Sequence, residues 1–327
     1  MKALLLKKYG PPEALTLGQI DKPAPGPHEV LVRVHAAAIN DFDWGLVRGR
    51  PRVYRLMYGL IRPKHRVPGM ELAGTIEAVG ENVKSFAPGD AVYGDISEYG
   101  FGALAEYVCV PEQAMRPKPP ELSFADAASL PHAGGLALQG LRDVGKIQTG
   151  QKILINGAGG GVGVLALQIA KLHGATVTGV DTGAKLSMMK DLGYDCVLDF
   201  RKEDFSQRSE RYDLILDCKT NRSPFVYARC LNPGGTYVTV GGALPRLLQV
   251  LLAAPWIART QNKRLRIVAL KANKDLEYLG DLYKNHQLRC VVDGPYAFSE
   301  APARIRYFGE GRHSGKVVLT LRNDRSQ

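Results

Sequence analysis

The chain has 327 residues, of which 45% are hydrophobic and 23% charged, as in an ordinary soluble protein of about two domains. The formal net charge is +11, so solvated basic faces must be weighed against surfaces that face an anionic ligand, an acidic membrane or nucleic acid. No aromatic pattern accompanies the lysines and arginines, which argues against a nucleic-acid partner and leaves solvated faces as the simplest interpretation.

Cysteine usage and apolar runs bear on the cellular location. The five cysteines are scattered and form no CxxC pair, which favours reduced thiols and a cytoplasmic location. The N-terminal apolar run is too short for a signal peptide. The longest apolar stretch, residues 243–258, falls short of the ~20 residues of a membrane span, so we expect at most a peripheral membrane contact.

The first part of the chain predicts short strands separated by glycine and proline turns. Runs of alternating or apolar residues occur near residues 3–6, 30–34, 69–79, 89–92 and 103–110. Between the second and third runs, residues 48–67 are rich in arginine and tyrosine and predict a loop. A proline-rich connector at residues 117–120 ends this β-rich part.

From Ser123 onward the pattern becomes helical and then alternates between strands and helices. Ser123 and Asp126 have the spacing of a helix cap. Strands are predicted at 153–155, 176–180, 196–198, 212–217, 235–240 and 265–270, with helices between them. Such alternation is typical of a doubly wound parallel sheet. Beyond it we expect helix 275–285, strand 290–293, helix 301–308 and strand 316–321.

The strongest motif lies between the first two of these strands. The turn reads Ala158-x-Gly160-x-x-Gly163, a relative of GxGxxG, and Asp181 follows about 20 residues later, at the end of the next strand. A pyrophosphate needs backbone amides at a helix N-terminus and no side chain in its way. The motif therefore predicts a dinucleotide site; the alternative is a tight α/β crossover that binds nothing.

These features together resemble the medium-chain dehydrogenase/reductase superfamily, in its zinc-free quinone-oxidoreductase-like branch. The resemblance rests on the β-rich front, the glycine turn and four further motifs, which are Gly69-Met70-Glu71, Pro88-Gly89-Asp90, Gly241-Gly242 and Ser314-Gly315-Lys316. It implies a Rossmann domain, residues 121–271, inserted into a GroES-like catalytic domain made of residues 1–120 and 272–327. It also implies dinucleotide contacts from Ala158, Gly160, Gly161, Val162, Gly163 and Gly241, and a homodimer.

The resemblance also bears on zinc. Zinc-using relatives supply a cysteine where this chain has Asn40, a histidine where it has Met70, and a further ligand near His132. Amide and thioether groups are poor zinc ligands. The four-cysteine loop of a structural zinc site is missing as well. We therefore predict no metal.

Without zinc, hydrogen bonds must polarise the substrate carbonyl. Zinc-free relatives use an Asn-x-x-Asp segment, which matches Asn40 and Asp43 here. By this resemblance, Asn40 would donate a hydrogen bond to the substrate oxygen, and Asp43 would have an orienting role. A plain turn residue is the alternative for Asn40. His132 lies at the start of a predicted helix and is a candidate proton donor, with a satisfied structural histidine as the alternative.

The cofactor signals conflict. Asp181 would bind a ribose 2′-hydroxyl and repel a 2′-phosphate, which favours NAD. Lys185 and Arg201 lie where NADP-using relatives carry basic residues, and either could pair with the phosphate. We expect use of both cofactors with a slight preference for NADPH, although Lys185 could equally be an exposed helix lysine.

Two classes of function remain open. The first is an enzyme: a zinc-independent NAD(P)H-dependent reductase of a quinone or an α,β-unsaturated carbonyl, or an alcohol dehydrogenase. The second is a dinucleotide-binding interaction protein with little turnover. The complete glycine turn together with Asn40 favours the enzyme.

Overall fold

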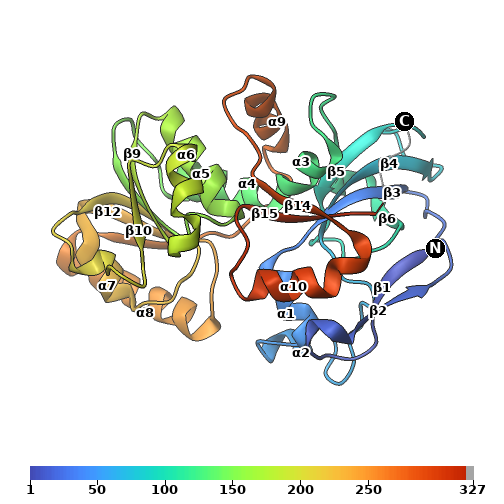
Figure 1. Ribbon diagram of the computed structural model, residues 1–327, viewed down its shortest axis with the longest axis horizontal. Coiled ribbons are helices and arrows are strands. Elements are labelled where there is room, and N and C mark those ends of the chain that lie inside the picture. The colour runs from blue at the N-terminus through green and yellow to red at the C-terminus, as the bar shows by residue number, and fades with distance from the viewer. Residues whose placement is uncertain (322–327) are drawn as a thin grey trace. The chain divides into compact units, whose positions relative to one another are not determined.

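The computed structural model describes residues 1–321 and divides into two compact units. Unit 1 comprises Met1–His132, Ala272–Lys284 and the described residues from Cys290 onward, and unit 2 comprises Ala133–Lys271 and Asn285–Arg289. The predicted fold class is confirmed, because unit 1 is β-rich and unit 2 contains a parallel sheet with helices (Figure 1).

Unit 1 is built on a seven-stranded sheet with the order β14-β15-β3-β4-β5-β7, in which β6 also pairs with β3. A separate hairpin is formed by β1 and β2, and α10 packs on α1 (Figure 1). The strands are β1 Lys2–Leu6, β2 Leu15–Gln19, β3 Glu29–Ala38, β4 Glu71–Val79, β5 Ala91–Asp95, β6 Tyr107–Pro111, β7 Arg116–Pro117, β14 Val292–Ala297 and β15 Lys316–Thr320. The helices are α1 Asp41–Arg48, α2 Val53–Tyr58, α3 Phe124–Ser129, α9 Leu276–Lys284 and α10 Ala301–Gly309.

The long strand β3 organises this unit. Three other strands pair with it, all antiparallel: β4, β6 and the late strand β15. Its apolar residues Val30, Val32 and Val34 lie in the main core with Leu72, whereas its C-terminal end leads directly to Asn40 and α1. Residues separated by almost the whole chain thus meet at the end of one strand.

Unit 2 is built on a six-stranded sheet of order β10-β9-β8-β11-β12-β13 in which every pairing is parallel. The strands are β8 Lys152–Asn156, β9 Thr176–Asp181, β10 Cys196–Asp199, β11 Tyr212–Asp217, β12 Leu231–Thr239 and β13 Arg264–Ile267. The helices are α4 Pro131–Leu138, whose first two residues belong to unit 1, a π-helical segment Gln139–Val144, α5 Gly161–Leu172, α6 Leu186–Leu192, α7 Pro224–Cys230 and α8 Leu244–Gln261.

The strand order explains where a ligand would bind in unit 2. The order reverses at β8, which is flanked by β9 on one side and β11 on the other. In open parallel sheets, ligands bind at the carboxyl ends of the strands beside such a reversal. The glycine turn follows β8 at this position.

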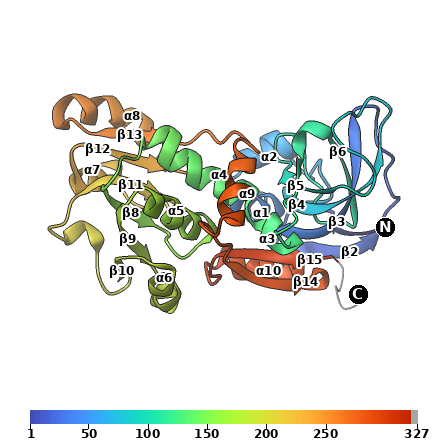
Figure 2. The same ribbon diagram turned by 90° about the horizontal axis from the view of Figure 1, so that it is seen from above.

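Most of the expected elements are present, within a few residues at their ends. Ser123 caps α3 as predicted, because its Oγ accepts a hydrogen bond from the Asp126 amide at 3.0 Å. The predicted loop 48–67 was wrong in part, since it contains the short helix α2. The apolar stretch 243–258 forms α8, which packs on β13 and α7 (Figure 2). No helix among residues 1–321 is long and apolar enough to cross a membrane.

Candidate active site

Asn40 is the N-cap residue of α1, and its side chain is held between two charged groups. Lys316 Nζ donates to Asn40 Oδ1 at 2.5 Å, and Asn40 Nδ2 donates to Glu71 Oε2 at 3.1 Å. A lysine can only donate and a carboxylate can only accept, so these two partners fix which end of the amide is oxygen. Nδ2 also donates to the Ala38 carbonyl at 3.5 Å, which is the longer and weaker of its two hydrogen bonds.

The two charged partners also pair with each other. Lys316 Nζ lies 2.7 Å from Glu71 Oε2, and both side chains are almost completely buried. A buried charge needs an opposite charge and hydrogen bonds, and here each group has both. Sequence analysis recorded Glu71 and Lys316 only as parts of family motifs. The signal it missed is that each of two largely apolar strands begins with a charged residue: β4 with Glu71 and β15 with Lys316.

Asp43 positions the first turn of α1. Its Oδ2 accepts from the Asn40 amide at 2.9 Å and its Oδ1 accepts from the Gly69 amide at 3.0 Å. Burial raises the pKa of Asp43 to about 7, although these two amides and the Lys316 charge act in the opposite direction. Asp43 therefore connects α1 to Gly69, two residues before β4, and its own side chain is completely buried.

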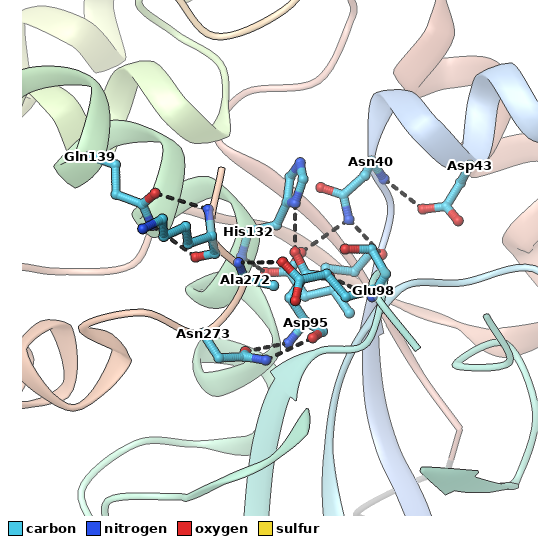
Figure 3. A network of polar contacts seen from close by, with 12 residues as sticks. Asn40, Asp43, Asp95, Glu98, His132, Gln139, Ala272 and Asn273 are labelled. Carbon is cyan, nitrogen blue, oxygen red and sulfur yellow. Dashed lines mark hydrogen bonds and ion pairs between the residues drawn. The ribbon is translucent and has the colours of Figure 1, made fainter. Parts of the chain in front are cut away.

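His132 is the second residue of α4 and the last residue of the first segment of unit 1. Its backbone amide donates to Glu71 Oε1 at 2.8 Å, and its ring Nδ1 lies 2.7 Å from Asp95 Oδ2. Asn273 in turn accepts a hydrogen bond from the Asp95 amide at 2.7 Å and donates to the Asp95 carbonyl at 2.8 Å (Figure 3).

The Asp95 carboxylate fixes the state of the His132 ring. Burial alone would raise the pKa of Asp95, but the hydrogen bond and charge of His132, with help from Ser97, hold it below its usual value. An ionised Asp95 accepts the Nδ1 proton, which leaves Nε2 as the ring atom that can exchange a proton with a ligand. Sequence analysis missed Asp95 entirely; its position at the end of a short strand gave no distinct pattern.

The glycine turn precedes α5 in unit 2, and Gly160 is the N-cap of that helix. At Gly163, a Cβ would lie 2.5 Å from the carbonyl oxygens of Gly157 and Ala158, so only glycine lets α5 begin this close to the turn. Gly157 has a positive φ of 89°, which also favours glycine. The first amides of α5, at Gly161 and Val162, point out of the helix end as unpaired donors do.

Asp181 and Lys185 form a second buried pair of opposite charges. Lys185 Nζ lies 3.3 Å from Asp181 Oδ1, and both side chains are less than 5% exposed. Asp181 Oδ2 also accepts from the Gly159 amide at 2.9 Å, so the acid at the end of β9 is tied to the glycine turn. The structure thus contradicts the alternative that Lys185 is an exposed helix lysine. Arg201, after β10, is exposed.

A second group of polar residues lies at the carboxyl ends of β11 and β12. The hydroxyl of Thr220 contacts that of Thr239 at 2.5 Å and donates to the Gly241 carbonyl. A Cβ at Gly241 would meet nothing within 4 Å, so this position borders open space. Asp217, at the end of β11, is fully buried and accepts from Asn156 and Tyr237; sequence analysis did not single it out.

The arginine-rich run of unit 1 lines a cavity of about 360 Å³. Its walls are Tyr9, Gly10, Pro11, Arg48, Arg50 and Arg55. The Arg55 guanidinium lies 4.8 Å from the Tyr9 ring centre, and that of Arg48 lies 4.2 Å from Trp44. None of the three arginines forms an ion pair with a carboxylate among residues 1–321. The cavity is therefore strongly positive.

Within residues 1–321, no three histidine, cysteine, aspartate or glutamate side chains converge as a metal site would require. The geometry instead defines a class of protein: a dinucleotide fold in one unit, and in the other a buried polar cluster that orients an amide and an imidazole. That combination is found in oxidoreductases that transfer hydride.

Comparisons with known proteins identify the family. The family description "Alcohol dehydrogenase GroES-like domain" matches residues 26–120, and "Zinc-binding dehydrogenase" matches residues 192–319. The 2-methylene-furan-3-one reductase of Solanum lycopersicum is 32% identical over 98% of this chain and 79% of its own length. The chloroplastic NADPH-dependent alkenal/one oxidoreductase of Arabidopsis thaliana is 31% identical over the same shares.

A solved structure supports the same conclusion. The quinone oxidoreductase from Coxiella burnetii is 29% identical, covers 98% of this chain and 99% of its own, and superposes with a TM-score of 0.87. The chain belongs to the medium-chain dehydrogenase/reductase superfamily, in its quinone-oxidoreductase-like branch. As a member, it is an NAD(P)-dependent oxidoreductase.

The residues of the turn fit such a cofactor. The 12-residue helix α5 has Gly160 as its N-cap and Gly161 and Gly163 in its first turn, and glycines at a helix N-terminus suit a pyrophosphate because they add no side chain there. The close contact of Gly163 with the turn keeps those amides in place. Asp181 ends β9, where a ribose is recognised in this fold, and Lys185 lies four residues later in the turn that follows.

Proposed function

We propose that the protein reduces a quinone or an α,β-unsaturated carbonyl by zinc-independent hydride transfer from NADPH or NADH. The observation that carries the proposal is the orientation of the Asn40 amide, which Lys316 and Glu71 fix from its two ends. The remaining hydrogen bond of Nδ2, to Ala38, is long at 3.5 Å, so that N–H can be exchanged for a substrate oxygen. The substrate class comes from the relatives, whose names describe reductases of enones and quinones.

In this proposal Asn40 binds the substrate oxygen. The cofactor, when bound, supplies a hydride to the substrate, and negative charge then develops on that oxygen. The Asn40 N–H stabilises the charge, as an oxyanion-hole donor does. Glu71 and Lys316 do not touch the substrate; they keep the amide from turning over. Asp43 fixes the backbone of Asn40 by accepting a hydrogen bond from its backbone amide.

His132 is the proposed source of the proton that completes the reduction. Asp95 binds Nδ1, and a proton on Nε2 can pass to the reduced product directly or through water. We further propose that Ala158, Gly160, Gly161, Val162, Gly163 and Gly241 border the dinucleotide, with Asp181, Lys185 and Arg201 near its adenosine end. The remaining proposals are a homodimer and a cytoplasmic location.

The direct test follows nicotinamide absorbance with NADPH and with NADH, using one small quinone, one short enone and one primary alcohol with NADP⁺. We expect turnover with the quinone or the enone. Asn40→Ala should lower kcat by about 10²-fold, the scale of one lost oxyanion donor, with cofactor affinity unchanged. Treatment with a chelator should leave the rate unchanged.

Two results would contradict the proposal. An Asn40→Ala rate equal to wild type would move carbonyl activation to another group. About one zinc per chain by elemental analysis, with activity lost on chelation, would replace the hydrogen-bond mechanism by a metal. His132→Gln, which keeps a polar side chain, should lower kcat and flatten its dependence on pH, whereas a purely structural histidine would change stability alone.

A further inference from the structure

The positive charge of this protein is concentrated in two segments that contain no acid. Residues 218–274 carry ten lysines and arginines and no aspartate or glutamate, and residues 44–70 carry seven and none. The rest of the chain therefore has a net negative charge. An uneven distribution of this kind creates local positive fields rather than a general increase in solubility.

The first segment contains α8, whose exposed face is apolar. Val250, Ala253 and Ile257 form the buried side of the helix. The opposite side exposes large apolar side chains to 48–72% of their full area, and these are Leu244, Leu248, Leu251, Leu252 and Trp256. At 100° per residue they cover an arc of about 140° over a helix about 27 Å long. We call these five residues the α8 face.

The α8 face continues onto α7 of the same unit. The Phe225 ring meets the Trp256 ring edge-on at 5.7 Å, and Phe225 is itself 43% exposed. Isolated exposed leucines are common, but a contiguous group of this kind marks an interaction surface. The helix cannot serve as a membrane span, because no helix among residues 1–321 meets that requirement.

Cations flank the α8 face. Arg259 is exposed on α8 itself, on the side of the five apolar residues, and Arg264 and Arg266 are exposed on β13, against which α8 packs. An apolar helix face with basic residues and no acid is the composition of helices that lie in the interface of an anionic bilayer, with the apolar side chains about 5–10 Å deep and the cations at the phosphates.

A second copy of this chain fits the α8 face less well. In a two-fold interface the same surface meets itself, so the cations of residues 218–274 would face each other without any acid of that segment to offset them. Lipid phosphates supply the opposite charge, and lipid tails accept the leucines and the tryptophan. We propose that unit 2 docks on anionic lipid bilayers through the α8 face. The proposal does not depend on the substrate or on catalysis.

The second acid-free segment is the competing docking site. On and after α2, Leu56, Met57, Leu60 and Ile61 are all at least 60% exposed, near the positive cavity of unit 1. These four residues span little more than one turn and the loop that follows, whereas the α8 face extends over more than three turns. The experiment therefore tests both segments.

The test measures co-sedimentation of the full chain with vesicles. One set is pure phosphatidylcholine, and the other contains 30% phosphatidylglycerol, each at ~50 mM and ~500 mM salt, chosen because screening lengths differ several-fold between them. We expect binding to the anionic vesicles at low salt, with a partition coefficient at least about tenfold lower on neutral vesicles or at high salt.

Surface variants locate the contact. Leu248→Gln/Leu252→Gln/Trp256→Gln should lower partition on anionic vesicles by at least about tenfold, since three side chains lose their transfer into lipid. The matched control, Leu17→Gln/Leu172→Gln/Tyr278→Gln, changes three other exposed apolar residues and should bind as wild type does. All six side chains are at least 40% exposed, so the fold should survive in both variants.

Charge variants separate the electrostatic part. Arg259→Gln/Arg264→Gln should lower partition by about 25-fold at low salt and by little at high salt, because each cation near an anionic surface contributes about fivefold. Lys190→Gln/Lys202→Gln removes two exposed cations of unit 2 outside the acid-free segment and should have little effect.

Tryptophan fluorescence gives an independent reading. The chain has two tryptophans, and Trp256 is 54% exposed. Vesicles with brominated lipid should quench and blue-shift the wild-type emission, and Trp256→Phe should abolish that change. The proposal is overturned if wild type does not bind anionic vesicles, or if the emission change survives in Trp256→Phe.

Two further outcomes would also overturn the proposal. If only Leu56→Gln/Ile61→Gln weakens vesicle binding, the second acid-free segment is the membrane contact. If wild type is a dimer that does not bind vesicles and the triple α8 variant is a monomer, the α8 face binds a second copy of the chain.

Discussion

The two units each contain a buried lysine–carboxylate pair, and the two pairs are built differently. In unit 1, Glu71 and Lys316 are separated by 245 residues of sequence and lie 2.7 Å apart. In unit 2, Asp181 and Lys185 are separated by four residues and lie 3.3 Å apart. The first pair joins strands from opposite ends of the chain, whereas the second closes one local turn against the glycine loop.

The difference teaches what each pair is for. Lys316 also donates to Asn40, so the distant pair fixes the orientation of a proposed catalytic amide. The local pair presents a carboxylate and an ammonium that neutralise each other where a ribose is expected. We therefore expect the first pair to be required for the structure of the site and the second to adjust which cofactor is preferred.

The largest expected effect comes from breaking the distant pair. Lys316→Met leaves Glu71 buried with no cation and Asn40 Oδ1 with no donor, and should lower the free energy of unfolding by about 3–5 kcal/mol. Chemical denaturation measures this. Lys22→Met removes a similar but exposed pair with Glu77 and should change stability far less. Adding Glu71→Gln to Lys316→Met should recover part of the lost stability. If Lys316→Met and Lys22→Met lower the free energy of unfolding equally, the buried pair is no more important for stability than the exposed pair.

A smaller effect should follow from Gly163→Ala in the local site. The added Cβ would lie 2.5 Å from two backbone oxygens, and relieving that overlap should cost about 1–3 kcal/mol and weaken dinucleotide binding. Gly174→Ala, past the other end of α5, meets no atom within 4 Å and tests the strain of a positive φ alone. Calorimetry with NADPH distinguishes the two, since the control should bind normally.

Variants of the local pair should shift cofactor preference in opposite directions. Asp181→Ser leaves Lys185 to attract a 2′-phosphate, so the NADPH-to-NADH ratio of kcat/KM should rise by about tenfold. Lys185→Met leaves the Asp181 charge uncompensated, so the ratio should fall by a similar factor. If neither ratio moves, the pair lies away from the ribose and cofactor choice rests on other residues, Arg201 first.

The smallest effect concerns pH and Asp43. Burial raises the pKa of this carboxyl to about 7 in the folded chain, above the ordinary value near 4 that holds when unfolded. The folded state therefore keeps a proton that the unfolded state releases, and the stability gained from it is lost as pH rises from about 4 to 7. The stability of wild type relative to Asp43→Asn should fall across that window; a flat difference would show that Asp43 stays ionised.

Features with local causes were predictable from the sequence. The glycine turn, Asp181 and the alternating strands follow from spacing within about 30 residues, and the Ser123 cap follows from spacing within four. The same logic placed Lys185 near Asp181 but did not predict its burial, because the fit of a side chain against a turn is not visible in spacing.

The unit 1 cluster was only half predictable. Asn40, Asp43 and His132 came from the family resemblance and from helix starts, whereas Glu71, Asp95 and Lys316 were not assigned any role. The pairing of Lys316 with Glu71 and Asn40 depends on β15 returning beside β3, and Asn40 and Lys316 are 276 residues apart. No local pattern encodes such a pairing; only the need of each buried charge for a partner hints at it.

The late position of Lys316 has a consequence for synthesis of the chain. When a ribosome has made residues 1–300, both segments of unit 2 are complete, whereas Glu71 and Asn40 still lack their cation. Since domains fold as units during synthesis, unit 2 can reach its final structure while β3 waits for β15. The nascent protein can therefore complete its dinucleotide fold before its proposed catalytic amide is fixed. A chain stalled in that interval should bind cofactor but not reduce substrate.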